Sequence, residues 1–440
     1  MGSHRHGILL TAGSNAKGQL GIGSYNDAHT FTPCQFAECK PNQLPKLTSR
    51  ITHIACGANH TVLLLEHLDG STTLWGTGDG RGGQFGPEYH PRDEPDPAPW
   101  TIFHKLVLPL SASNRYASCG YTYKRIAAAW ETTYVVLSCP GHSDVLLSMG
   151  SNDFGALGVG EGMGRDGDES VPGEPRVVDF DHIFPNDSGH HAAPRTICVQ
   201  SLHAGPRHVV AQLVMASNDG SSSYSQTALV GWGASRHGQL GQNGGVRFVA
   251  RPTPLPINIH EDPMVSCALG NQHTVVLHES GRISALGSNK QSQIPSFKSQ
   301  KRICRLRCTW NGTYMQTVDG DKHGLLSTGN NAQGQLGRSC TVESASAVDT
   351  TVSLPVDRVI SSLVCGSEHV LVAMSSSVQE GDSVLGWGWN EHGNMGLGSL
   401  GNVSIPAQLW PREDIEAYSK YPQRVTGIWA GCATSWLLVE

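Results

Sequence analysis

The chain has 440 residues, with 31 Lys and Arg against 37 Asp and Glu, so its formal net charge is −6 with the histidines neutral. This acidic balance, without any run of five like charges, argues against a basic arm that binds nucleic acid. The N-terminal segment is too short and too polar for a signal peptide, and no apolar run reaches membrane-spanning length. We therefore expect a soluble intracellular protein that contacts neither nucleic acid nor membrane directly.

The twelve cysteines are dispersed and contain no Cys-x-x-Cys pair. Two closer pairs, Cys34 with Cys39 and Cys304 with Cys308, each lack the second pair that a structural zinc site needs. The cysteines are expected to be reduced and to pack as small hydrophobic side chains. The sequence thus predicts no metal site and no cofactor.

The first predicted element is a strand over residues 6–12, and a glycine-rich turn over residues 13–21 follows it directly. The turn reads Gly-Ser-Asn-Ala-Lys-Gly-Gln-Leu-Gly, and its glycines supply positions where φ is positive. Strict and looser copies of this first motif return at residues 82–86, 150–158, 233–241, 287–295, 329–337 and 388–396. The motif therefore occurs seven times.

A second motif begins at residues 54–64 and consists of a β-rich run, a turn of small residues that often ends in His, and an apolar strand. Its later copies are centred on residues 129–132, 205–208, 270–273, 309–312, 366–369 and 431–434. The two motifs alternate strictly along the chain. Short β-branched runs between glycine turns predict strands, and one pair of motifs fits one small antiparallel sheet.

Seven paired motifs predict an all-β fold, a single seven-bladed β-propeller of four-stranded antiparallel blades over residues 1–440. Strands at His6–Ala12 and Ser435–Glu440 lie at the two ends of this repeat array. If they pair within one blade, neither leaves a free sheet edge. We therefore expect the fold to be closed by pairing of its terminal strands.

The spacing between equivalent motif positions varies, from 42 residues between positions 292 and 334 to 83 between positions 155 and 238. The excess predicts loop insertions near 87–99, 160–194, 217–226 and 401–423, all rich in Pro, Gly, Ser or acidic residues. Almost no helix is expected outside them, with a helical segment near residues 411–418.

The alternating motifs resemble the regulator-of-chromosome-condensation repeat over essentially the whole chain. Within that family the chain is most similar to stand-alone fungal members linked to α-tubulin suppression and killer-toxin insensitivity. Three segments carry this likeness, namely Ala12–Asn15, Cys56–Thr61 and the unusual Ala128–Thr132. The resemblance implies a monomeric, non-catalytic scaffold of the cytoplasm, with the nucleus as a second location.

The same resemblance implies a partner and two processes. The fungal relatives bind a small CSL-type zinc-finger metalloprotein, and together the pair supports diphthamide synthesis on elongation factor two. The pair also supports modification of the tRNA wobble uridine by the Elongator complex, which is a further possible partner.

The alternative is a guanine-nucleotide exchange factor for the small GTPase Ran. In that relative, exchange depends on acidic and histidine side chains in the second-motif turns. Here the two variable positions of the seven turns contain no Asp and no His, and Glu131 and Glu368 are their only acids. These departures favour the scaffold over the exchange factor, and we expect no catalytic residue.

Because every second-motif turn occupies the same place in its unit, the variable turn residues are expected to surround one mouth of the propeller. Exposed aromatic and polar side chains there are typical of binding surfaces. His60, His208, His273 and His369 recur at one repeat position, which predicts a hydrogen bond that braces the turn rather than catalysis. The predicted partner-binding residues are Trp130, Glu131, Arg207, Gln272, Trp310, Asn311 and Glu368.

Overall fold

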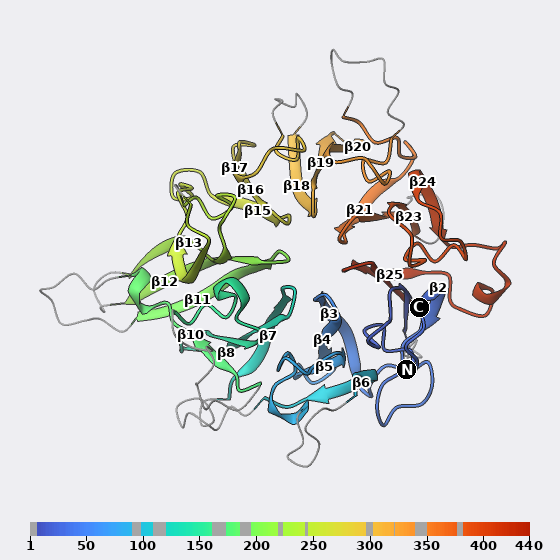
Figure 1. Ribbon diagram of the computed structural model, residues 1–440, viewed down its shortest axis with the longest axis horizontal. Coiled ribbons are helices and arrows are strands. Elements are labelled where there is room, and N and C mark those ends of the chain that lie inside the picture. Colours follow the sequence, from blue (N-terminus) through green and yellow to red (C-terminus); the bar gives the residue numbers. More distant parts are fainter. Residues whose placement is uncertain are drawn as a thin grey trace, which may run out of the picture. The chain divides into compact units, whose positions relative to one another are not determined.

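A computed structural model describes residues 7–89, 98–108, 120–160, 173–184, 195–218, 223–242, 245–295, 302–320, 322–338, 350–375 and 382–440. Its strands form seven sheets, and the fold is a seven-bladed β-propeller, as predicted (Figure 1). Helix within the described ranges is limited to short 3₁₀ segments at η1 (Pro87–Tyr89), η2 (Asp153–Gly155), η3 (Asp181–Ile183) and η4 (Glu416–Tyr418). The last of these lies where the sequence predicted a helical segment.

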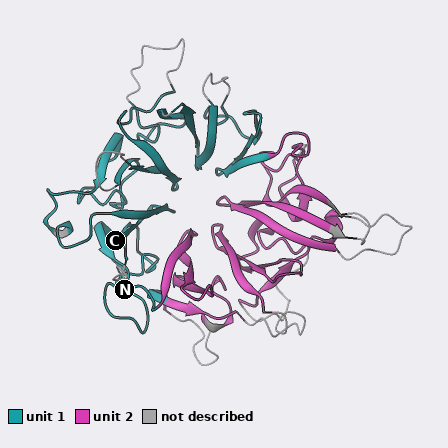
Figure 2. Ribbon diagram, turned by 180° about the vertical axis from the view of Figure 1, so that it is seen from behind, with its two compact units in different colours: residues 1–46, 100–103, 264–440 teal, residues 47–99, 104–263 magenta. Residues whose placement is uncertain are grey.

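The chain divides into two compact units, coloured separately in Figure 2. Unit 1 comprises residues 1–46, 100–103 and 264–440 and holds four sheets. The strands of these sheets are β1 (Ile8–Gly13), β2 (Ala28–Pro33), β25 (Val425–Ala430) and β26 (Thr434–Val439); β15 (Met264–Leu269), β16 (His273–His278) and β17 (Ile283–Gly287); β18 (Arg302–Thr309), β19 (Gly312–Asp319) and β20 (Lys322–Gly329); and β21 (Val359–Cys365), β22 (His369–Ser375), β23 (Ser383–Gly388) and β24 (Val403–Trp410).

Unit 2 comprises residues 47–99 and 104–263 and holds three sheets of four strands. Residues 100–103, at the start of strand β6, are grouped with unit 1. The strands are β3 (Thr48–Cys56), β4 (His60–His67), β5 (Thr72–Gly78) and β6 (Trp100–Leu106); β7 (Thr122–Ala128), β8 (Thr132–Ser138), β9 (Val145–Gly150) and β10 (Arg176–Val178); and β11 (Arg195–Ala204), β12 (His208–Asn218), β13 (Ser223–Ala234) and β14 (Phe248–Pro254).

The predicted pairing of the terminal strands is confirmed. Strand β1 pairs antiparallel with β26 from Ile8 opposite Val439 to Gly13 opposite Thr434, and the sheet order is β2-β1-β26-β25. Every residue of β26 is buried. The observed strand limits differ from the predicted ones by one residue at three of the four ends. At the fourth, β1 begins at Ile8, and His6, where the predicted strand begins, lies outside the described residues.

Two sheets have three strands in the described part of the chain rather than the expected four, namely β15–β17 and β18–β20. In the second of these, a single bridge between Leu326 and Thr351 stands where an outer strand would pair. The sheet β15–β17 ends just before the shortest interval between first motifs, and this interval contains the fewest residues from which a fourth strand could form.

Two of the predicted insertions are corrected by the structure. Residues 217–226 were expected to form a loop, but β12 and β13 extend into this segment and pair up to Asn218 opposite Ser223, and only residues 219–222, which lie outside the described residues, are left for a loop. Most of the first half of 401–423 is strand β24, whose register shifts twice against β23 and so hides the strand pattern in the sequence. The other two insertions, 87–99 and 160–194, fall largely outside the described residues.

The first motif forms a turn held by its own side chains, which explains its Asn and Gln. Asn15 Oδ1 accepts the Leu20 N–H at 2.9 Å, and Asn331 and Asn390 accept the N–H five residues later in the same way. Gln19 Oε1 accepts the Lys17 N–H at 2.9 Å. Since these bonds satisfy backbone groups that no strand pairs, the turn keeps its shape beside the sheet.

The hydrophobic core lies between neighbouring sheets within each unit. In unit 2, Tyr134 and Leu146 of one sheet pack with Val209 and Trp232 of the next. The Trp232 indole N–H also donates to the Ala156 carbonyl at 2.9 Å. Each sheet is therefore stabilised mainly by burial against its neighbour, since a four-stranded sheet alone leaves its faces uncovered.

Candidate protein-binding site

In unit 2 the second-motif turns are joined to one another by backbone hydrogen bonds. The Ala58 N–H donates to the Trp130 carbonyl at 2.8 Å, and the Trp130 N–H donates to the Pro206 carbonyl at 2.9 Å. The turns β3–β4, β7–β8 and β11–β12 therefore lie side by side. This arrangement brings together the three predicted site residues of this unit, Trp130, Glu131 and Arg207.

Unit 1 repeats the arrangement with the remaining site residues. The Asn271 N–H donates to the Trp310 carbonyl at 2.8 Å, and the Trp310 N–H donates to the Ser367 carbonyl at 2.8 Å. The Ser367 N–H continues the series to the Gly431 carbonyl at 3.0 Å. Gln272, Trp310, Asn311 and Glu368 thus lie in turns that are neighbours within this unit.

Three of the four recurrent histidines connect one sheet to the next rather than bracing their own turn, which corrects the sequence prediction for them. Nε2 of His60 lies 3.1 Å from Thr133 Oγ1, Nε2 of His273 lies 3.2 Å from Thr313 Oγ1, and Nε2 of His369 lies 3.1 Å from Ser435 Oγ. All three rings are buried, and burial lowers each of their pKa values to about 4. Neutral, buried imidazoles of this kind are structural groups.

The glycine three residues before each of these histidines is required by close approach. A Cβ atom at Gly57 would lie 2.1 Å from His60 Cε1, and the same clash would arise at Gly270 and Gly366. In the second blade the two equivalent positions are Ala129 and Thr132. Because Thr132 has no ring, the Cβ atom of Ala129 does not meet this clash. The Gly-x-x-His spacing is thus one packing unit.

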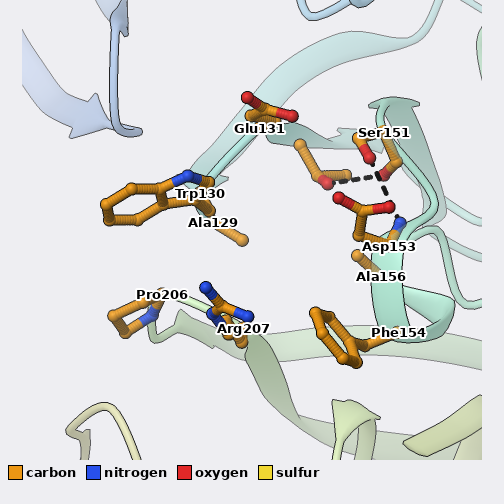
Figure 3. Close-up of a pocket in the computed structure, with 10 residues that line it drawn as sticks. Ala129, Trp130, Glu131, Ser151, Asp153, Phe154, Ala156, Pro206 and Arg207 are labelled. Atoms are coloured by element: carbon orange, nitrogen blue, oxygen red, sulfur yellow. Dashed lines mark hydrogen bonds between the residues drawn. The ribbon is translucent and has the colours of Figure 1, made fainter.

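A pocket of about 140 Å³ opens between the β7–β8 turn and the β11–β12 turn of unit 2 (Figure 3). Trp130 and Phe154 form its aromatic walls, and they are 38% and 40% exposed. The guanidinium of Arg207 lies over the Phe154 ring, 5.2 Å from the centroid. The carboxylates of Glu131 and Asp153 complete a lining that is both aromatic and charged.

The unit 1 residues are more enclosed. Asn311 Nδ2 donates to Glu368 Oε1 at 3.0 Å, and Gln335 Nε2 donates to Glu368 Oε2 at 3.0 Å. Partial burial raises the pKa of the Glu368 carboxyl above its usual range, against the lowering effect of these two amides. Trp310 and Gln272 are half-buried, so Trp310 is less exposed than the sequence suggested.

Sequence reasoning missed Phe154 and Asp153. Both lie in a first-motif turn, a segment interpreted only as a glycine-rich connection. Phe154 has a φ of 59°, an uncommon value for a residue other than glycine, and its ring lies against Arg207 of the neighbouring sheet. An aromatic residue in a turn where other copies have small or polar residues is the signal that could have found it.

Within the described ranges, no three His, Cys, Asp or Glu side chains gather closely enough to share a metal ion. None of the described helices is long and apolar enough to cross a membrane. The thiols of Cys34 and Cys267 are buried and that of Cys308 is half-buried, and desolvation raises the pKa of each, which makes them poor nucleophiles.

Comparison with known proteins agrees with the repeats and the fold. The model of the regulator of chromosome condensation (RCC1) repeat matches residues 6–64 and 229–277. These two segments of the chain are therefore RCC1 repeats. An RCC1 repeat-containing protein of Schizosaccharomyces pombe is 25% identical, over 98% of this chain and 99% of its own length.

A second curated protein and a solved structure are also similar to this chain. The mouse secretion-regulating guanine nucleotide exchange factor is 24% identical, over 97% of this chain and 82% of its own. The crystal structure of Prp20p from Saccharomyces cerevisiae covers 100% of this chain and 92% of its own with a TM-score of 0.65 at 17% identity, a likeness of fold alone. An RCC1-repeat propeller of this kind is suited to protein binding.

Proposed function

We propose that this RCC1-repeat protein is a non-catalytic scaffold that binds a small CSL-type zinc-finger metalloprotein through its second-motif turns. Through that partner it would support diphthamide synthesis and Elongator-dependent modification of the tRNA wobble uridine. The protein would act as a monomer in the cytoplasm, with the nucleus as a second location. The zinc belongs to the partner, and this chain supplies the surface that holds it.

The observation that carries the proposal is the aromatic and charged pocket of unit 2. Trp130 and Phe154 supply exposed apolar area, while Glu131, Asp153 and Arg207 supply charges beside it. An aromatic anchor with a polar rim is the composition that protein-binding surfaces favour. The segment Ala128–Thr132, whose sequence resembles the fungal members, contributes Trp130 and Glu131 to this pocket.

Replacing Trp130 with Ala is expected to weaken binding of the zinc-loaded partner by about 2 kcal/mol, because truncating a central aromatic anchor removes most of its contact area. Isothermal titration calorimetry with the purified zinc-finger protein measures this loss. Trp310→Ala should weaken binding comparably but also lower the melting temperature, since Trp310 is half-buried.

Leu68→Ala is the matched control. Leu68 is 54% exposed and follows strand β4 at the end opposite its second-motif turn. Its truncation should leave affinity unchanged. If both tryptophan variants bind as tightly as the parent chain, the partner does not use the second-motif turns.

The exchange-factor alternative is favoured by one observation, the name of the mouse relative. We expect this chain not to accelerate release of labelled GDP from Ran, because the variable turn positions lack the Asp and His residues of the family's exchange site. Glu368, one of their two acids, already accepts hydrogen bonds from Asn311 and Gln335. A GDP-release rate well above buffer, approaching that of the authentic Ran exchange factor run in parallel, would establish exchange activity instead.

A further inference from the structure

We infer that the pocket of unit 2 binds an uncharged carboxamide, the side chain of a Gln or Asn on the partner's surface. The inference rests on the proposed function, since the pocket is part of the proposed binding surface, and it adds the chemical class of the group that enters it. It depends on two opposite charges that line the pocket without pairing; the third charged side chain of the lining, Glu131, points away from Arg207 in Figure 3.

Arg207 and Asp153 are those charges. Both side chains line the pocket (Figure 3), yet among the described residues no ion pair joins them and neither side chain makes a hydrogen bond. Arg207 has one face against the Phe154 ring, so the N–H groups at its edge remain available as donors. Asp153 offers only acceptors.

The backbone around the two charges is fixed. The Ser151 N–H donates to the Glu131 carbonyl at 2.9 Å, and Thr132 Oγ1 donates to the Ser151 carbonyl at 2.8 Å. The Asp153 N–H in turn donates to Ser151 Oγ at 3.2 Å. These bonds hold the first-motif turn against the β7–β8 turn, so the gap between the charges is part of the folded structure.

A charged side chain fits this gap poorly. A carboxylate that approached Arg207 would face Asp153, and an ammonium that approached Asp153 would face Arg207. A carboxamide satisfies both, because its carbonyl accepts from the guanidinium and its NH₂ group donates to the carboxylate. Its methylene groups would lie between Trp130 and Phe154, and the pocket, at about 140 Å³, suits one short side chain.

The test uses three small probes with the same carbon skeleton, butyramide, butyrate and butylammonium. Binding to the whole protein is followed by the NMR shift of the Trp130 indole N–H, assigned with a Trp130→Phe variant. Butyramide should bind best, and each charged probe should bind about tenfold more weakly, which corresponds to one uncompensated like charge.

Two variants should reverse the order of affinity. Asp153→Asn removes the acid that lies opposite Arg207 and should make butyrate the best probe, while Arg207→Gln should make butylammonium the best. Glu261→Gln, an exposed acid of the same unit outside the pocket, is the matched control and should leave the order unchanged. Melting curves confirm that each variant is folded.

A parent chain that binds no probe, binds all three equally, or prefers a charged one overturns the inference. Titration with the zinc-finger partner separates this from the proposed function. If the partner binds while butyramide does not, the proposed scaffold function is supported and the inference of a carboxamide in the pocket is wrong. If butyramide binds with the expected reversals while the partner does not, the pocket stands and the proposed partner is wrong.

Discussion

Acidification from pH 7 to pH 4 is expected to unfold this protein, because three buried histidines must remain neutral in the folded state. Burial lowers the pKa values of His60, His273 and His369 to about 4, while an exposed histidine in the unfolded chain titrates near 6.5. Nδ1 of His273 and of His369 has no hydrogen-bond partner among the described residues. A proton added there would be a buried charge without an acceptor.

The sign follows from which state binds the protons. Above pH 6.5 both states hold neutral histidine, and the three residues add no pH dependence. Between pH 6.5 and 4 these histidines bind protons in the unfolded state but not in the folded state, so the free energy of unfolding falls as the pH falls. Each histidine removes about 3 kcal/mol by pH 4, and three together remove about as much as the whole stability of an ordinary domain.

The raised pKa of Glu368 works in the opposite direction, since its folded state favours the protonated form, but it is one partly buried group against three histidines. Urea unfolding curves between pH 7 and pH 5 measure the net slope. His369→Gln should lose about 2 kcal/mol less over this interval than the parent chain, because one titrating group is gone.

The exposed His260 provides the control, and His260→Gln should keep the parent slope. If His369→Gln and His260→Gln give the same pH dependence, the acid sensitivity does not come from the buried rings. The slopes are compared rather than the absolute stabilities, because His369→Gln also alters the contact with Ser435.

Deleting residues 435–440 should give insoluble protein rather than a mildly destabilised one. The deletion removes strand β26 from the middle of its sheet and leaves β1 and β25 without the neighbour that lies between them. It also uncovers Leu10, Ile428 and the surrounding apolar cluster. Unpaired edges beside exposed apolar surface promote association between chains.

The soluble fraction after expression and size-exclusion chromatography measure this outcome. A chain that lacks only Glu440 is the control and should remain soluble, because β26 ends at Val439. A monomeric truncated protein with the parent melting temperature would count against closure through β26.

Most of the fold could be predicted because the repeated glycines mark the turns between strands. Glycines such as Gly18 occupy left-handed positions that other residues avoid, so each copy of the turn is visible in the sequence. Outer strands are harder to recognise. Strand β24 shifts register against β23, and in the described part of the chain a single bridge at Thr351 stands beside β20, so neither shows an alternating pattern.

The candidate site was predictable only in part, since turn position says where a residue lies but not what already contacts it. Trp130, Glu131 and Arg207 were found because they vary within a repeated turn. Asp153 and Phe154 belong to the other motif. Hydrogen bonds at Ser151 hold their turn against the β7–β8 turn of the same sheet, and Phe154 meets Arg207 of the neighbouring sheet. That Glu368 is engaged by Asn311 and Gln335 depends on side-chain geometry, which the repeat does not encode.

The pairing of β1 with β26 also constrains how the protein is made. The Thr11 hydroxyl donates to the Ser435 carbonyl across 424 positions of sequence. At a translation rate of about 5–20 residues per second, β1 leaves the ribosome roughly 20–80 seconds before its partner strand exists. Throughout that interval β2 is the only strand available to it within its sheet, and the other edge of β1 stays open on the nascent chain. Completion of this blade therefore waits until β26 has been synthesised, and a ribosome stalled before that point would hold a chain whose first strand lacks this partner.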